Sequence, residues 1–254
     1  MIEVIQIPAL QDNYIYFIID KQSSLTACVD PSLADPVINL LKKKNLKLDF
    51  ILNTHHHYDH VGGNLELKEK TQCKIIGAEI DKKRIPGIDI YLKDKEIFFL
   101  GSSKFIAIET PGHTVGHICF YFDGDNILFS GDTLFGLGCG RLFEGTPKQM
   151  WSSLKFIKNL PNETLIYCGH EYTESNLKFA ISLLPDDEDL EKKKNKIKSL
   201  RKKGIPTIPT TIGEEKRFNP FLKVDDEEFL EKVDLKNMEE NMVFEKIRKL
   251  KDIF

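Results

Sequence analysis

The sequence predicts an α/β protein whose last third is helical, for three reasons. Short runs rich in β-branched and aromatic residues recur up to Glu174 and alternate with helical patterns. Beyond Glu174 the strand signals disappear and the chain becomes helical and highly charged. A length of 254 residues suits a main domain with a smaller appendage. We therefore expect two domains, residues 1–173 and residues 174–254.

The N-terminal region is expected to begin with strands separated by turn-like stretches, at Ile2–Pro8, Tyr14–Ile19 and Leu25–Val29. Asp35–Lys44 is predicted to be a helix, because its apolar residues recur at helical spacing and Asn45 follows. A compact apolar strand is then expected at Asp49–Asn53.

The rest of this domain is expected to consist mostly of short strands. The predicted strands are Lys74–Gly77, Glu96–Leu100, Phe105–Glu109, Ile118–Phe122, Asn126–Ser130 and Thr164–Tyr167. Pro147–Leu160 is predicted to be a helix that buries Met150, Leu154 and Ile157.

The C-terminal region has a distinctive charge pattern. Acidic residues from Asp186 precede a basic run that ends at Lys203, before Gly204, as in a solvated helix whose charges complement its dipole. Ile205–Pro220 contains three prolines and is expected to be an extended loop. Final helices are expected at Asp225–Lys232 and Lys236–Leu250.

Composition excludes several classes of protein. Hydrophobic residues make up 41% of the chain and the formal net charge is −3, which disfavours wholesale disorder and a surface built for nucleic acid. No apolar run approaches the roughly 20 residues of a membrane-spanning helix, and the N-terminus lacks the pattern of a signal peptide. A cytoplasmic location is therefore expected. The five cysteines are scattered, and buried free thiols are expected rather than disulfides.

Histidine is concentrated in a few short segments. All seven histidines lie in three clusters, the first of which directly follows the predicted strand Asp49–Asn53. His55 and His57 alternate by two, so an extended backbone points both side chains the same way. Asp59 and His60 follow, just before two glycines that allow a sharp turn.

The same pattern follows three further predicted strands, where a glycine stands next to a histidine or an aspartate. These residues are His113, Asp132 and His170. Nitrogen and carboxylate ligands suit zinc, iron or manganese, and a purely structural site would be richer in thiolates. One shared carboxylate would give each of two metals four protein ligands, as in two-metal hydrolases. His56 and His117 are not needed as ligands, and their role stays open.

With these residues in place, the chain resembles the metallo-β-lactamase superfamily, through its His-x-His-x-Asp-His signature and the later ligands. The resemblance implies a four-layer αββα sandwich followed by an all-helical C-terminal domain. It also implies that His55, His57 and His113 bind one metal, that Asp59, His60 and His170 bind the other, and that Asp132 bridges them.

Finer motifs resemble glyoxalase II, the hydroxyacylglutathione hydrolases. An aspartate at position 132, rather than a cysteine, speaks against the true β-lactamases. The motifs similar to glyoxalase II are Gly138–Thr146, Gly169–Thr173, Asn219–Phe221 and the basic end Arg248–Asp252.

The same resemblance implies a set of substrate-binding residues. Tyr172, Arg248 and Lys251 match residues that bind the glutathione part of the substrate. Arg141 stands where the family commonly has lysine, and it keeps the positive charge. Phe143 stands where many members have tyrosine, so one hydroxyl donor is missing.

The expected activity is hydrolysis of the thioester in S-(2-hydroxyacyl)glutathiones such as S-D-lactoylglutathione, in methylglyoxal detoxification. Asp59 and Asp132 are the expected catalytic residues, beside two divalent metal ions, most readily zinc. A glutathione thioester is the expected partner, with no nucleic acid and no membrane, and the chain is expected to be a monomer or weak oligomer.

Three alternative functions are compatible with parts of the sequence. A persulfide dioxygenase of the same superfamily would use one iron, and oxygen consumption would reveal it. A nucleic-acid-processing protein would use the basic segment that ends at Lys203, and a salt-dependent gel shift would reveal it. A non-catalytic binding module is disfavoured because every ligand position is filled.

Overall fold

The computed structural model describes residues 1–254, which pack into two compact units. Unit 1 comprises residues 1–110 and 115–131, and unit 2 comprises residues 111–114 and 132–254.

Unit 1 contains two groups of hydrogen-bonded strands. The first is a six-stranded sheet in chain order, in which β1–β2 and β2–β3 are antiparallel and the pairs from β3 to β6 are parallel. The second is an antiparallel series from β7 to β10. The strands are β1 (Ile2–Ala9), β2 (Asn13–Asp20), β3 (Thr26–Val29), β4 (Phe50–Leu52), β5 (Lys74–Ala78), β6 (Ile90–Leu92), β7 (Ile97–Leu100), β8 (Ser103–Glu109), β9 (Ile118–Phe122) and β10 (Ile127–Gly131).

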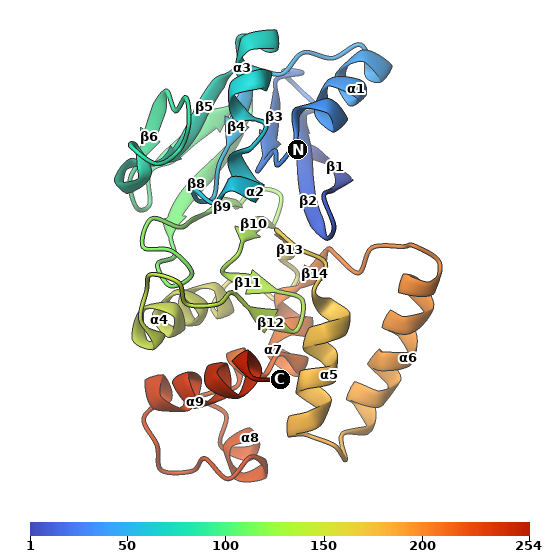
Figure 1. Ribbon diagram of the computed structural model, residues 1–254, viewed down its shortest axis with the longest axis vertical. Coiled ribbons are helices and arrows are strands. Elements are labelled where there is room, and N and C mark those ends of the chain that lie inside the picture. The colour runs from blue at the N-terminus through green and yellow to red at the C-terminus, as the bar shows by residue number, and fades with distance from the viewer. The chain divides into compact units, whose positions relative to one another are not determined.

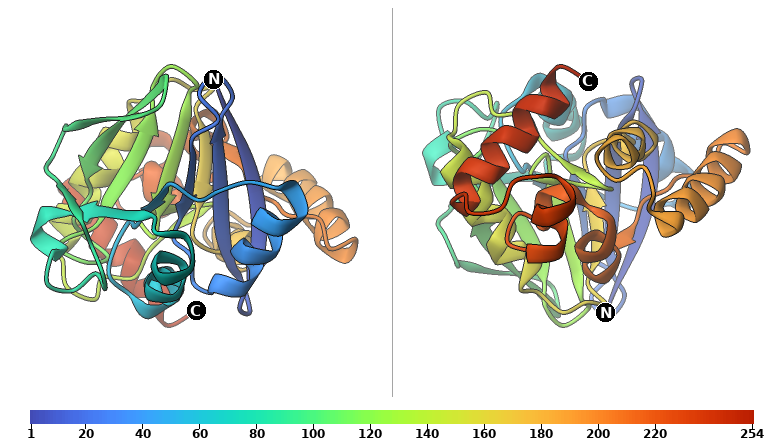
Figure 2. Two further views of the ribbon diagram at one scale, coloured as in Figure 1. Left: turned by 90° about the horizontal axis from the view of Figure 1, so that it is seen from above. Right: turned by 90° about the horizontal axis from the view of Figure 1, so that it is seen from below.

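Helices connect the parallel strands of the first sheet, because parallel neighbours need a crossover. α1 (Ala34–Lys44) leads from β3 to β4, and the short α2 (Tyr58–Val61) and α3 (Asn64–Thr71) lead from β4 to β5. The 3₁₀ helix η1 (Glu79–Asp81) follows β5. α1 and α3 contact each other and pack on the same face of this sheet (Figure 2, left).

β2 is buried on both faces. Phe17 belongs to the apolar cluster under α1 and α3. Tyr16 points the opposite way, as the period of two in a strand requires, and its ring lies 5.5 Å from that of Phe129 in β10. The rings of Phe50 in β4 and Phe98 in β7 meet in the same manner at 5.4 Å. The two sheets of unit 1 therefore pack face to face through aromatic side chains.

Asp20 ties the end of β2 to the turn between β7 and β8. Its buried carboxylate accepts hydrogen bonds from backbone or hydroxyl groups of Ser23, Ser102 and Ser103. Burial on its own raises the pKa of this carboxyl, but the hydrogen bonds favour the charged form more strongly. The pKa of Asp20 therefore lies well below its usual value.

We expect Asp20→Asn to lower the free energy of unfolding at pH 7 by about 3 kcal/mol. The amide nitrogen of asparagine is a donor, and it would face groups that now donate to the carboxylate. A lowered folded-state pKa stabilises the fold above the unfolded pKa, and this contribution is lost as the pH falls through the folded-state pKa. The deficit should therefore be full at neutral pH and shrink below about pH 4. Urea unfolding of the metal-free proteins measures it. Asp123→Asn serves as the control, because it removes a partly exposed ion pair with Lys104 and keeps an oxygen acceptor for Gly124 N–H. An equal deficit in both variants would contradict the prediction.

Unit 2 combines short strands with most of the helices. β11 (Leu134–Phe135) and β12 (Gly138–Cys139) form a hairpin, and β13 (Leu165–Cys168) pairs with β14 (Thr210–Thr211). The helices are α4 (Pro147–Lys158), α5 (Thr173–Leu183), α6 (Glu188–Lys202), α7 (Ile212–Phe218), η2 (Pro220–Leu222), α8 (Glu227–Lys232) and α9 (Glu240–Asp252). α5 lies beside α6, and α9 lies against α4 (Figure 1).

α4 begins where the local sequence favours a helix start. The Thr146 side chain accepts a hydrogen bond from Gln149 N–H, and the Gln149 side chain accepts one from Thr146 N–H. This capping box satisfies two donors that a helix start leaves unpaired. The predicted inward residues Met150, Leu154 and Ile157 are all buried.

The prediction of an extended loop over Ile205–Pro220 is wrong, because this segment contains β14 and α7. The Thr211 side chain caps α7 by accepting a hydrogen bond from Glu214 N–H. Acidic residues in the first turn and basic residues in the last turn suit the helix dipole. All three prolines of the segment lie outside α7, so they do not interrupt it.

The other predicted strands and helices are confirmed with small shifts at their ends. The largest shift is at α9, which begins at Glu240 rather than at Lys236. The five cysteines are free and buried, as expected. No helix of the structure has both the length and the apolar character needed to cross a membrane.

Candidate metal centre

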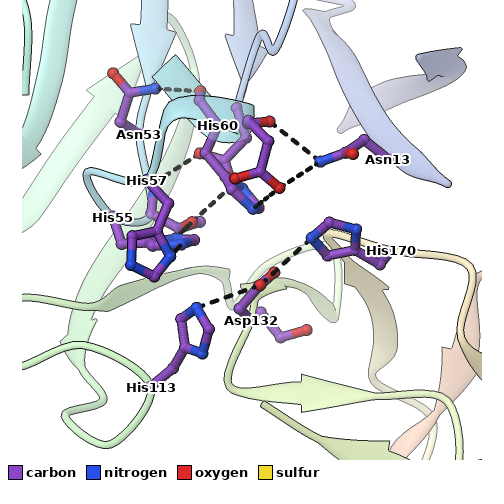
Figure 3. A network of polar contacts seen from close by, with 12 residues as sticks. Asn13, Asn53, His55, His57, His60, His113, Asp132 and His170 are labelled. Atoms are coloured by element: carbon purple, nitrogen blue, oxygen red, sulfur yellow. Dashed lines mark hydrogen bonds and ion pairs between the residues drawn. The ribbon is translucent and has the colours of Figure 1, made fainter. Parts of the chain in front are cut away.

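The first group of predicted ligands lies in unit 1, directly after β4. His55 and His57 lie in the segment that leaves β4, and Asp59 and His60 lie in α2. The His55 ring centroid is 4.7 Å from that of His57 and 4.1 Å from that of His60. Figure 3 shows these three imidazoles in one cluster. The predicted convergence of these side chains is thus present in the structure.

Asp30, which follows β3, anchors this cluster. Its buried carboxylate accepts hydrogen bonds from Thr54 N–H at 2.8 Å, from Thr54 Oγ1 at 2.6 Å and from His60 Nδ1 at 2.9 Å. Ligand atoms of Asp30, His55 and His60 all lie within 4.8 Å of one another. Because Nδ1 of His60 carries the proton in this arrangement, its Nε2 offers a lone pair, 3.5 Å from Asp59 Oδ2.

Thr54 orients His55 in a similar way. The Thr54 hydroxyl donates its hydrogen to Asp30, so it accepts from His55 Nδ1 at 3.0 Å. His55 Nε2 is then left as an acceptor, 3.1 Å from His57 Nδ1. Neutral imidazoles held in this orientation are prepared to bind a cation.

Asn13, at the start of β2, holds Asp59. Its side-chain amide donates to the Asp59 backbone oxygen at 3.1 Å and to Asp59 Oδ2 at 3.0 Å. Figure 3 shows Asn13 pointing toward the residues beside His60. The Asp59 side chain is 37% exposed, so these bonds rather than packing fix its orientation.

The second group of predicted ligands meets in unit 2. Asp132 Oδ2 lies 3.5 Å from His113 Nε2 and 3.4 Å from His170 Nε2. All three residues are buried. In Figure 3 the two imidazoles point at the Asp132 carboxylate from two sides. One carboxylate oxygen is therefore shared by two imidazoles.

The backbone around Arg141 sets the orientation of His113. His113 Nδ1 donates to the Arg141 carbonyl at 2.8 Å. A carbonyl only accepts, so Nε2 of His113 carries the lone pair that faces Asp132. A Cβ at Gly140 would lie 2.0 Å from the Asp132 backbone oxygen and 3.0 Å from His113 Nδ1, so only glycine allows this close approach.

The donor atoms of both groups suit divalent transition metals. They are imidazole nitrogens and carboxylate oxygens, most of them buried. His60 and His113 each direct Nδ1 to an oxygen acceptor, which is the usual arrangement of metal-binding histidines. Nitrogen and oxygen donors without sulfur fit zinc, iron or manganese.

The two remaining histidines contact the same region in other ways. His56 Nδ1 lies 3.1 Å from Oδ2 of the buried Asp81. His117 stacks on the His55 ring at 5.0 Å, and its Nδ1 lies 2.9 Å from Thr110 Oγ1. Both side chains therefore support the segment that carries the first ligand group.

Three basic residues predicted to bind substrate gather in unit 2. Arg248 is buried, and its guanidinium donates to the Cys139 carbonyl at 3.0 Å. Burial, together with repulsion from Arg248 and Arg141, lowers the pKa of Lys251 to about 8, against the attraction of Asp252. Asp252, which pairs with Arg248 at 3.0 Å, offsets part of this repulsion, and a bound anion would relieve more of it.

Two aromatic residues predicted to contact substrate lie against ligand histidines of unit 2. The Tyr172 ring stacks on the His170 ring at 4.7 Å with an interplanar angle of 1°. The Phe143 ring meets the His113 ring edge-on at 5.1 Å, and its side chain is 63% exposed. An exposed aromatic side chain beside a ligand histidine is available to a substrate.

Sequence comparison extends these observations to the whole chain. Residues 15–170 match the sequence model of the metallo-β-lactamase superfamily, and residues 171–254 match that of the hydroxyacylglutathione hydrolase C-terminus. The chain is 48% identical to the hydroxyacylglutathione hydrolase of Methylococcus capsulatus, over 100% of this chain and 99% of the relative. It is 50% identical to that of Pelagibacter ubique, over 99% of this chain and 100% of the relative.

The chain belongs to the hydroxyacylglutathione hydrolase family. The family was predicted from the motifs of the sequence, and the matches confirm that prediction.

Solved structures share the fold. A metallo-β-lactamase from Staphylococcus aureus superposes with a TM-score of 0.68 at 22% identity, over 99% of this chain and 71% of that chain. A protein solved in a di-iron-bound form superposes with a TM-score of 0.62 at 25% identity, over 87% of this chain and 100% of that chain. The predicted metallo-β-lactamase fold class with a helical C-terminal region is confirmed for this member of the hydroxyacylglutathione hydrolases.

Several residues that orient the ligands in this family member were missed by sequence reasoning. They are Asn13, Asp30 and Thr54. Asp30 directly follows β3 as Asp132 directly follows β10, but an aspartate after a strand is also a common turn residue, so its signal is weak. Asn13 lies in a turn-like segment and carries no comparable signal.

Proposed function

We propose that this protein hydrolyses the thioester bond of S-(2-hydroxyacyl)glutathiones, such as S-D-lactoylglutathione, to a 2-hydroxy acid and glutathione, in methylglyoxal detoxification. The observation that carries the proposal is the similarity to hydroxyacylglutathione hydrolases along the whole chain, including residues 171–254. A match confined to the metallo-β-lactamase part would leave the substrate open, because a fold does not determine function.

The proposed cofactor is a pair of divalent metal ions, with zinc preferred and iron or manganese as alternatives. The orientation of the imidazoles toward carboxylates within each unit supports this proposal, as does the di-iron-bound form of a 25% identical structure. The proposed ligands are His55, His57 and His113 for one ion, Asp59, His60 and His170 for the other, and Asp132 for both.

When bound, two such ions acidify a water molecule at neutral pH and polarise the thioester carbonyl. Asp59, held by Asn13, is oriented to accept a hydrogen bond from the attacking water and so to direct it. Asp132 Oδ2 lies 3.5 Å from His113 Nε2 and 3.4 Å from His170 Nε2, so its carboxylate would be available to the ion beside each imidazole. The glutathione thiolate leaves without a strong acid, because a thiol has a pKa of about 8.5.

The proposed glutathione site uses the cluster of cations in unit 2. Glutathione carries two carboxylates, for which Arg and Lys side chains make charge-assisted hydrogen bonds. Arg141, Arg248 and Lys251 are the proposed partners, with Tyr172 and Phe143 beside the ligand histidines. Phe143 lacks the hydroxyl of the usual tyrosine and offers only its ring face.

We also propose residues 1–173 as the catalytic domain and residues 174–254 as the substrate-binding domain. The family matches to residues 15–170 and 171–254 support this boundary. The cytoplasmic location and the monomeric or weakly oligomeric state remain predictions.

The pKa of Lys251 provides a test of its proposed role. Because its pKa is lowered to about 8, Lys251 is charged below this pH and becomes neutral above it. We expect the KM for S-D-lactoylglutathione to rise about tenfold between pH 7 and pH 9.5, the value of one charge-assisted hydrogen bond. The arginine of Lys251→Arg stays charged over this pH range, so the rise of KM should be smaller in this variant. The amine of the substrate titrates with both proteins, so the difference between them reports Lys251 alone. Identical profiles for the two proteins would show that Lys251 does not bind the substrate.

The proposed activity is tested on purified protein. We expect two metal ions per chain and thioester hydrolysis of S-D-lactoylglutathione, followed by the release of free thiol. Full metal loading without thioesterase activity would reject the proposed substrate. Oxygen consumption with a glutathione persulfide would instead identify the dioxygenase alternative.

A further inference from the structure

The β11–β12 hairpin lies between two functional positions of unit 2. Asp132 precedes it and Arg141 follows it, each by two residues. Its turn contains Leu137 with φ +59°, a left-handed conformation that is uncommon for a residue with a Cβ. The Asn176 side chain from α5 donates to the carbonyl of Gly136 at 3.0 Å. A strained turn of this kind persists only where its surroundings hold it.

Two side chains, one within α7 and one directly after it, hold the rest of the turn. Leu137 N–H donates to Glu215 Oε2 at 2.7 Å. Asn219 Nδ2 donates to the carbonyl of Gly138 at 3.0 Å and to Glu215 Oε2 at 2.9 Å. Glu215 and Asn219 therefore bind each other. Glu215 accepts a hydrogen bond from the turn, and Asn219 donates one to it.

Glu215 is unusual among the glutamates of the chain, because it is fully buried. It accepts hydrogen bonds from Leu137 N–H, from Asn219 Nδ2 and, at 2.8 Å, from Thr210 Oγ1. Burial raises the pKa of Glu215 to about 7, and hydrogen bonds from Asn219, Leu137 and Thr210 oppose this rise. Burial of a carboxylate is costly, and here three donors converge to offset the cost.

Backbone carbonyls of the segment after the turn accept hydrogen bonds from two residues of the proposed site, Arg248 and His113. The Cys139 carbonyl accepts from Arg248 at 3.0 Å, and the Arg141 carbonyl accepts from His113 Nδ1 at 2.8 Å. Both carbonyls lie within four residues of Leu137 on one short stretch of chain. A shift of the turn would therefore move Arg141 and Arg248 together.

We propose that Glu215, together with Asn219, is a positioning residue that holds the β11–β12 turn and so places Arg141 and Arg248 for binding of the substrate. The proposal rests on the proposed function of these two arginines. It assigns Glu215 to no step of the reaction, because it contacts only the hairpin, Thr210 and Asn219.

The test uses the full-length, metal-loaded protein and the variant Glu215→Ala. Loss of the acceptor for Leu137 N–H should raise amide hydrogen exchange in residues 134–141 by about tenfold or more, the effect of one lost charged hydrogen bond. The KM for S-D-lactoylglutathione should rise by about tenfold, with kcat changed by less than about threefold.

Two further variants separate positioning from general destabilisation. Glu215→Gln keeps an acceptor for Leu137 and can donate its amide to Thr210, so the exchange and KM of this variant should stay close to wild type. Glu214→Ala changes the preceding residue, which pairs with Lys193, lies 3.2 Å from Thr210 Oγ1 and makes no hydrogen bond to the hairpin. Because Thr210 keeps its shorter hydrogen bond to Glu215, this variant should also leave both readouts unchanged.

Unchanged exchange and KM in Glu215→Ala would overturn the proposal. So would an equal rise of KM in Glu214→Ala, or loss of protection spread over the whole chain rather than confined to residues 134–141. Hydrogen exchange needs no substrate. A wild-type protein that fails to hydrolyse the thioester would therefore reject the proposed function, while the exchange result still decides whether Glu215 holds the turn.

Discussion

Asp132→Ala should lose both metal ions together and lower kcat/KM by at least about 10³-fold, since a two-metal centre supplies several kcal/mol of transition-state stabilisation. The buried Asp132 Oδ2 lies 3.5 Å from His113 Nε2 and 3.4 Å from His170 Nε2. These two histidines are assigned to different ions in the proposed centre. Removing the one carboxylate between them therefore removes a ligand from each ion.

Elemental analysis by mass spectrometry and the thioesterase assay measure the two effects on the same preparation. Asp123→Ala is the matched control, because its carboxylate lies in the turn before β10 and pairs with Lys104 at 3.0 Å. The control should keep both ions and full activity. Loss of a single ion from Asp132→Ala would contradict bridging, and retention of both ions would contradict the assignment of Asp132 as a ligand.

The residues proposed as ligands could be singled out from the sequence because their signal is local. His55 and His57 directly follow an apolar strand, and His113, Asp132 and His170 repeat the pattern with a glycine nearby. A strand end brings its following residues to the rim of a sheet whatever the details of packing. This rule predicts only that the side chains converge, whereas their division between two ions is implied by the resemblance to the metallo-β-lactamase superfamily.

The residues that orient the ligands could not be predicted in the same way. Asp30 lies 30 residues before His60 in sequence, and an aspartate after a strand is equally common as a turn residue. Glu215 lies in a charged run in which full burial is unexpected for glutamate. The helix that carries Glu215 was hidden by flanking prolines. Such contacts depend on tertiary packing, which local sequence patterns do not encode.

Asp30→Asn should weaken metal binding by about 10–100-fold, the usual effect of removing a carboxylate that orients a ligand histidine. The Asp30 carboxylate accepts from Thr54 Oγ1 and from His60 Nδ1 through the same oxygen. If the amide nitrogen takes the place of that oxygen, it donates to His60 Nδ1 and moves the imidazole proton to Nε2. A protonated Nε2 cannot bind a metal ion. Competition with a chromogenic chelator measures the affinity.

Asp49→Asn is the control for this change, because it separates the tautomer of His60 from the general cost of losing a partly buried carboxylate that accepts hydrogen bonds from a threonine. Asp49 also accepts hydrogen bonds from a threonine backbone and hydroxyl, those of Thr26, at 2.8 and 3.3 Å, but it contacts no histidine. Both variants should lose stability, and only Asp30→Asn should lose metal affinity. Excess zinc should restore the activity of Asp30→Asn, since the ligands themselves remain. If the two variants bound metal equally well, the Asp30 carboxylate would stabilise the ends of β3 and β4 without fixing the tautomer of His60.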